Sequence, residues 1–111
     1  MTTKYQIIRT DGTMTNEIID WPREPGYDAI AELIRPLIGG AHLEHVSVLH
    51  NGGRRDMFVD ENGHAKNLPF NEKATAIYRH NWLTQRPKTD PASLAWIVGT
   101  AILFPDQIIW A

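Results

Sequence analysis

YDAIAELIRPLIGGAHLEHVSVL, residues 27–49, passes from a helical pattern to an extended one without a linker. In residues 27–38 the apolar side chains fall at the i, i+3, i+4 and i+7 spacing of one helix face: Ile30, Leu33, Ile34 and Leu37. Gly39-Gly40 is typical of a helix end, because glycine adopts the left-handed conformation that a C-cap requires. Residues 42–49 then predict a strand. The stretch therefore indicates a domain that mixes helices and strands.

Pro36 lies inside the apolar stripe of this helix. A proline has no N–H to donate, and its ring clashes with the carbonyl four residues earlier, here that of Glu32. We therefore expect the helix to end or kink near Arg35.

Two hairpins are predicted by short β-rich runs that are separated by turn residues. The first joins strands within residues 4–9 and 15–21 through residues 10–13, because the Asp-Gly pair there is a strong hairpin signal. The second joins the strand at residues 42–49 to a partner at residues 55–60 through a glycine-rich turn.

The second half of the chain predicts a turn, a helix and a central strand. Asn62 and Gly63, in the turn after residue 60, are suited to positive φ. Asn71 is a good N-cap, because its side-chain oxygen accepts a free backbone N–H of the following helix. Leu94–Phe104 is the most apolar run and predicts a central strand, in which Gly99 indicates a bulge or a close backbone approach.

Together these elements predict a single α+β domain over residues 1–111, in the order ββαββαβ. We expect a mainly antiparallel sheet with two helices on one face, and Trp82 and Trp96 in the core. Gln107–Trp110 would add a final edge strand. Because this segment is apolar and has no protective lysine or proline, it either folds back onto its own core or pairs with a second copy in a homodimer.

Composition and charge exclude several classes of protein. The 111 residues are 42% hydrophobic and 22% charged, as in an average globular domain rather than a disordered chain. A net charge of -2 argues against a nucleic-acid partner, because proteins that bind nucleic acids usually carry an excess of basic residues. The absence of cysteine excludes disulfides and thiolate chemistry. Without an apolar run of about 18 residues or a signal-peptide pattern, we expect a cytoplasmic protein with no membrane partner.

Three of the five histidines cluster at the strand predicted for residues 42–49. Side-chain alternation places His42, Glu44 and His50 on one face and His45 on the other. His42 and His50 would lie roughly 26 Å apart along an extended strand, so they cannot share a metal ion. No nucleophile elbow, Walker loop or dinucleotide fingerprint occurs. The sequence thus indicates no catalytic residue, no metal and no cofactor.

Two groups of residues are candidate binding sites. Arg54 and Arg55 follow a glycine-rich turn and predict an anion site, since guanidinium groups bind oxyanions bidentately; an ordinary charged hairpin is the alternative. The second group lies between a strand and the N-terminus of the second helix, a common place for a site on a surface turn. Its residues are Asp60, Glu61, Asn62, His64 and Asn71.

Residues 57–78, MFVDENGHAKNLPFNEKATAIY, resemble a pattern found in small bacterial and phage proteins of the domain-of-unknown-function family 3846. The run Leu68–Ala76 is the most specific part, and residues 97–103 are similar to the closing strand of the family. The similarity covers most of residues 30–104 and departs from the family at Pro36. The resemblance implies a mobile-element protein without an established activity, and it transfers no functional residue.

These observations predict a small, non-enzymatic binding or regulatory protein with a protein as its partner. Two alternatives stay open. A small hydrolase would use His45 or His64 with Asp60 or Glu61 as its carboxylate. An inhibitor of a host defence or DNA-processing enzyme would use the acidic character of the chain to compete with a polyanion.

Overall fold

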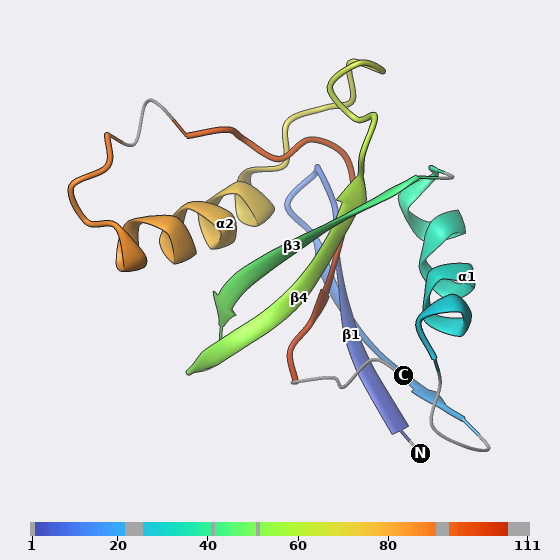
Figure 1. Ribbon diagram of the computed structural model, residues 1–111. Coiled ribbons are helices and arrows are strands. Elements are labelled where there is room, and N and C mark those ends of the chain that lie inside the picture. Colours follow the sequence, from blue (N-terminus) through green and yellow to red (C-terminus); the bar gives the residue numbers. More distant parts are fainter. Residues whose placement is uncertain (1, 22–25, 41, 51, 91–93, 107–111) are drawn as a thin grey trace.

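The computed structural model describes residues 2–21, 26–40, 42–50, 52–90 and 94–106. Two helices and a five-stranded antiparallel sheet follow one another in the predicted order ββαββαβ, which confirms a single α+β domain (Figure 1). The elements are β1 (Thr2–Ile8), β2 (Met14–Asp20), α1 (Tyr27–Ile38), β3 (Leu43–His50), β4 (Gly53–Asp60), α2 (Glu72–Gln85) and β5 (Ala101–Phe104). The final edge strand expected at Gln107–Trp110 lies outside the described residues.

The strand order in the sheet is β2-β1-β5-β4-β3, so β5 is central, as the sequence predicts. However, β5 is shorter than the expected Leu94–Phe104. Gly99 turns the chain at φ 76°, and a Cβ there would lie 2.8 Å from Leu68 Cδ1. The predicted close approach at Gly99 is therefore confirmed, and the residues before it run beside residues 68–71 instead of joining the sheet.

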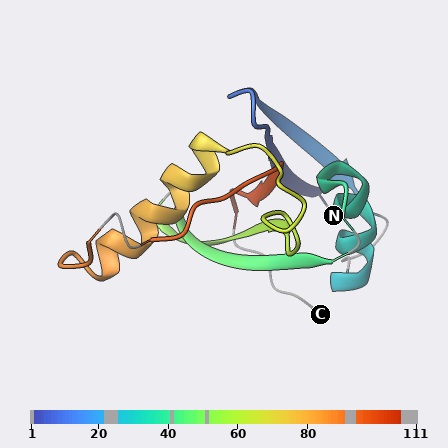
Figure 2. The same cartoon turned by 90° about the horizontal axis from the view of Figure 1, so that it is seen from above.

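The two helices cover opposite faces of the sheet, so the prediction that both lie on one face was wrong (Figures 1 and 2). The reason is the alternation of side chains along each strand. One core packs against α1, and its members are Ile7, Ile30, Ile34, Ile38, Phe58, Ile102 and Phe104. The other packs against α2, and its members are Ile8, Val48, Met57, Val59, Ala74, Ile97, Ala101 and Leu103.

Helix α1 continues through Pro36 to Ile38, so the expectation that it ends near Arg35 was wrong, while a kink there stays a prediction. Pro36 and Glu32 both lie on the exposed side of the helix. The Glu32 carbonyl that loses its helical N–H partner can therefore bind water, which lowers the cost of the proline. Gly39 ends the helix as predicted, at φ 79°, and its N–H donates to the Arg35 carbonyl at 2.8 Å.

The turn after β4 differs from its prediction. Neither Asn62 nor Gly63 adopts positive φ; that conformation falls on Asn67, at φ 54°. Gly63 is needed for space, because a Cβ there would lie 2.9 Å from Val98 Cγ2. The turn is therefore folded tightly against the segment that precedes β5.

The described helices contain 12 and 14 residues. Neither is long and apolar enough to cross a bilayer, for which about 20 residues are needed.

Candidate functional site

Asn71, expected on the surface, is fully buried, so its place in the candidate surface site was wrong. Its role as N-cap of α2 is confirmed: its side-chain oxygen accepts the Ala74 N–H at 3.0 Å. Its amide nitrogen donates to the carbonyls of Ile8 at 2.9 Å and Gly99 at 2.8 Å. One amide thus joins β1, α2 and the segment before β5, which is a structural role.

Asp60 ends β4 with its side chain only 1% exposed. One carboxylate oxygen accepts a hydrogen bond from the Lys66 ammonium at 2.7 Å, and the other accepts one from the Asn62 N–H at 2.8 Å. The hydrogen bond from Lys66 lowers the pKa of Asp60 below its usual value, with the Asn62 N–H in support, although burial opposes the shift. Gly40 leaves room for this carboxylate, because a Cβ there would lie 2.7 Å from Asp60 Cγ.

The other predicted residues of this site lie on the exposed turn. Glu61 donates its backbone N–H to the His42 carbonyl at 3.0 Å. The His64 ring bonds through Nε2 to the Trp96 carbonyl at 2.9 Å, and its plane meets the Trp96 ring edge-on. Since Asp60 bonds to Lys66 and His64 bonds to a carbonyl, the structure does not join Asp60 and His64 as an acid–base pair.

A pocket of about 150 Å³ lies where β3 and β4, the turn after β4, α2 and the segment before β5 meet. We call it the side-chain pocket. Its lining residues are Glu44, Val46, Val59, Asp60, His64, Tyr78, Ala95, Trp96, Ile97 and Val98. Of the five residues predicted for the surface site, the pocket brings together two, Asp60 and His64.

The charge of the side-chain pocket is negative. Asp60 is neutralised by Lys66. Glu44 is exposed and has no hydrogen-bond or ion-pair partner within the described part of the chain. Valines and Ile97 form an apolar floor, while Tyr78 and Trp96 add aromatic surface. The arrangement therefore combines an apolar floor, aromatic surface and one unneutralised carboxylate.

Sequence reasoning missed Glu44, Tyr78 and Trp96. Trp96 was expected in the core, but half of it (50%) is exposed. The misassignment follows from treating residues 94–104 as one strand, because Gly99 separates Trp96 from the sheet. The available signal was Gly99 itself, since a glycine at a close approach ends regular pairing.

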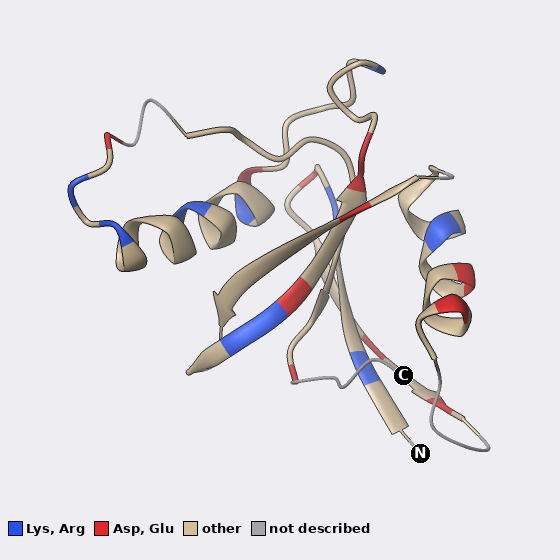
Figure 3. Ribbon diagram, viewed as in Figure 1, with Lys and Arg blue, Asp and Glu red and all other residues tan. Residues whose placement is uncertain are grey.

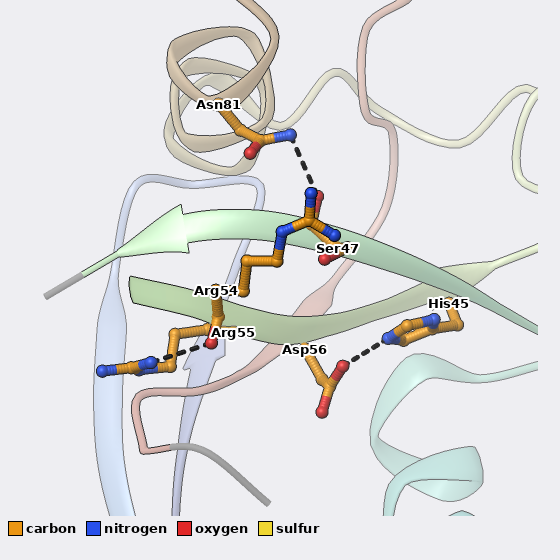
Figure 4. A network of polar contacts seen from close by, with 6 residues as sticks. All are labelled: His45, Ser47, Arg54, Arg55, Asp56 and Asn81. Atoms are coloured by element: carbon orange, nitrogen blue, oxygen red, sulfur yellow. Dashed lines mark hydrogen bonds and ion pairs between the residues drawn. The ribbon is translucent and has the colours of Figure 1, made fainter. Parts of the chain in front are cut away.

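Arg54 and Arg55 do not converge on one anion site. Arg55 donates from Nε to the Pro105 carbonyl at 2.7 Å and from a terminal nitrogen to the Arg54 carbonyl at 2.8 Å (Figure 4). A hollow of about 300 Å³ beside the turn is lined by Leu49, His50, Gly52, Gly53 and His80, and by neither arginine.

His45 forms a pair that the sequence did not predict. Its Nε2 lies 2.5 Å from an Asp56 carboxylate oxygen, on the α1 side of the β3–β4 hairpin (Figure 4). The two side chains are 49% and 19% exposed. His45 faces away from Glu44 and His50, as expected from alternation. Over the described ranges, no three residues of metal-binding type lie together.

Charges of both signs are spread over the molecule. Figure 3 shows acidic and basic residues interspersed on α1 and β4, and mostly basic residues along α2.

No family model matches this sequence, and neither a curated protein nor a solved structure matches it.

Proposed function

We propose that this chain is a non-enzymatic binding protein, and that its side-chain pocket receives one basic side chain of a protein partner. The observation that carries the proposal is a small apolar pocket that is lined both by Trp96 and by a carboxylate, Glu44, that has no partner among the described residues.

The size of the pocket favours a single side chain over a whole metabolite. Its volume is about 150 Å³. Sites for small molecules commonly hold about 300–1,000 Å³. A protein partner can insert one residue here and make its remaining contacts on the surrounding surface.

The lining chemistry favours a lysine or arginine as that residue. A cation over an aromatic ring gains about 0.5–2 kcal/mol, and the hydrocarbon part of the side chain can pack on apolar surface. An exposed ion pair with Glu44 adds at most about 1 kcal/mol. An anionic side chain would gain neither term and would be repelled by Glu44.

Glycine-flanked lysine and arginine pentapeptides are expected to bind with a Kd near 1 mM, because one side chain supplies roughly 4 kcal/mol at most. Titration followed by ¹H–¹⁵N NMR should move the Trp96 indole and the Glu44 amide. Trp96→Ala is expected to weaken binding at least tenfold. Glu44→Gln should weaken it about two- to fivefold, in keeping with a solvent-exposed ion pair.

Phe70→Ala is the matched control, since Phe70 is an exposed aromatic residue that does not line the pocket. It should leave peptide binding unchanged. A norleucine pentapeptide that binds as tightly as the lysine pentapeptide would show that the pocket does not select a cation. Absence of any shift at Trp96 with all three peptides would overturn the proposal.

A small hydrolase is the second candidate, and the 2.5 Å His45–Asp56 contact favours it. Ser47 lies opposite Asp56 in the strand register, two residues from His45. Under the binding proposal, hydrolysis of 4-nitrophenyl acetate by the protein should equal that by His45→Gln. His64→Gln is the control for general imidazole reactivity. A rate that falls at least tenfold in His45→Gln alone would replace the binding proposal with the hydrolase.

The other expectations from the sequence stay predictions: a mobile-element origin, inhibition of a host enzyme and a cytoplasmic location. The homodimer through Gln107–Trp110 falls on residues outside the described ranges.

A further inference from the structure

The two edges of the sheet differ in how they are covered. The β3 edge meets α2, where the Asn81 amide donates to the Ser47 carbonyl at 3.1 Å (Figure 4). The other edge is β2, which pairs only with β1 in the described sheet. Among the described residues, therefore, the β3 edge contacts a helix, whereas the seven-residue strand β2 is paired on one side only and presents a template for strand pairing.

The backbone groups that face outward on β2 follow from its hairpin. The Arg9 N–H donates to the Thr13 carbonyl at 2.9 Å, so these two residues form a hydrogen-bonded pair. Along an antiparallel ladder, hydrogen-bonded pairs alternate with non-hydrogen-bonded pairs, so Thr15 and Glu17 belong to the next two hydrogen-bonded pairs. The even-numbered residues of β2 therefore direct their N–H and C=O groups away from β1.

The side chains of the same residues include the two most exposed aliphatic groups of this strand. Ile18 is 64% exposed and Met14 is 45% exposed. Met14 is opposite Ile8, a member of the α2-side core, so the Met14 side chain projects on the α2 side of the sheet. Ile18 lies four residues further along the same strand and therefore projects on the same side. Helix α2 does not cover them, and β2 contains neither lysine nor proline to block pairing.

We propose that a second copy of this chain pairs with β2 in antiparallel fashion, with Asn16 opposite Asn16 about a two-fold axis. This register sets Met14 of each copy against Ile18 of the other and lets the two Asn16 amides hydrogen-bond. A register centred on Glu17 would place two carboxylates directly opposite each other. One centred on Ile18 would leave Met14 beyond the end of the partner strand.

Charge complementarity supports the register on the α1 side of the strand. Thr15 would face Glu17 of the second copy. The Thr15 hydroxyl already accepts a hydrogen bond from the Arg9 guanidinium at 2.5 Å. Each Glu17 carboxylate would therefore approach an Arg9 across the interface, twice by symmetry. The contact is a single strand pair, smaller than the roughly 1,200–2,000 Å² of stable interfaces, so self-association is expected at high micromolar concentration.

Single-cysteine variants test the register, because the chain has no cysteine of its own. In a hydrogen-bonded pair the Cα atoms lie about 5.5 Å apart, within the range of about 4.4–6.8 Å for a disulfide. Asn16→Cys should cross-link to a dimer under mild oxidation. Ile18→Cys should not, since its two copies would be offset by four residues, about 13 Å. Cross-linking of Ile18→Cys in preference to Asn16→Cys would overturn the register.

Sedimentation velocity tests the dimer without cross-linking. Ile18→Lys, which places a lysine on the open edge, should weaken self-association at least tenfold. Leu37→Lys is the matched control, because Leu37 is an exposed aliphatic residue on α1 (37%), and it should self-associate like the parent chain. A parent chain that stays monomeric at 1 mM, or an equal loss in both lysine variants, would overturn the proposal.

Discussion

Replacing Asn71 with alanine is expected to lower the free energy of unfolding by about 4 kcal/mol. Loss of the N-cap bond to Ala74 costs about 1 kcal/mol. The Ile8 and Gly99 carbonyls would then lose their bonds to a side chain with no solvent exposure. Each such unsatisfied buried group costs about 1–3 kcal/mol. The total free energy of unfolding of a small domain is only about 5–15 kcal/mol, so the variant should be close to unfolding.

Urea unfolding followed by circular dichroism measures this loss, and two variants sharpen the result. Asn71→Asp keeps the acceptor for Ala74 but turns a carboxylate toward two carbonyl oxygens, so at pH 7 it should be at least as damaging as alanine. Asn62→Ala removes the side chain of an exposed asparagine and should stay within about 0.5 kcal/mol of the parent. A loss below 1 kcal/mol in Asn71→Ala would contradict the structural role.

Lys66→Met is expected to destabilise the protein by about 2 kcal/mol at pH 7, because a hydrogen bond to a charged group contributes about 1.5–3 kcal/mol. Among the described residues, the Asp60 carboxylate would keep only the Asn62 N–H as a hydrogen-bond donor, while its side chain stays 1% exposed. Lys66 is itself 42% exposed, so the loss should fall short of that for a fully buried pair.

The pH dependence of this effect has a definite sign. The pKa of Asp60 is lowered in the folded protein, chiefly by the Lys66 hydrogen bond. Its contribution to stability is therefore present above the unfolded pKa of about 3.9 and is lost as pH falls through the folded value. In Lys66→Met the part of that lowering that Lys66 supplies disappears, while the smaller contribution of the Asn62 N–H stays. The difference in unfolding free energy between the parent and Lys66→Met should thus be largest at pH 7 and shrink below about pH 4.

Lys88→Met is the control for this series, since Lys88 is exposed on the loop after α2. Its unfolding free energy should match the parent at every pH. A constant difference between the parent and Lys66→Met from pH 7 to pH 2.5 would mean that Lys66 acts through packing rather than through the charge of Asp60.

Local features of the fold could be predicted because each depends on a few neighbouring residues. The Asp-Gly hairpin, Gly39 at the end of α1 and Asn71 at the start of α2 are set by backbone conformation and local hydrogen bonds. The placement of the helices is a long-range property. Adjacent apolar residues such as Ile7-Ile8 and Met57-Phe58 nevertheless indicate strands that are buried on both faces, and therefore a helix on each face of the sheet.

The candidate site was harder to predict because it is assembled from distant segments. Asp60 and His64 could be chosen from one turn, but Trp96 reaches the same pocket only because Gly99 turns the chain away from the sheet. Asn71 was correctly read as a cap and wrongly read as a surface group. The same amide also bonds to carbonyls 63 and 28 residues away, contacts that no local pattern contains.

The central position of β5 determines when the sheet can be completed during synthesis. The β1–β2 and β3–β4 hairpins are made first, yet in the sheet they are joined through β5, which lies between β1 and β4. An isolated two-stranded hairpin is marginally stable in water. Until Phe104 has left the ribosome, the two hairpins therefore have no common strand, and their apolar residues stay accessible to chaperones and proteases. The sheet cannot be completed before β5 is made, and folding should be slow, because it depends on contacts between distant residues.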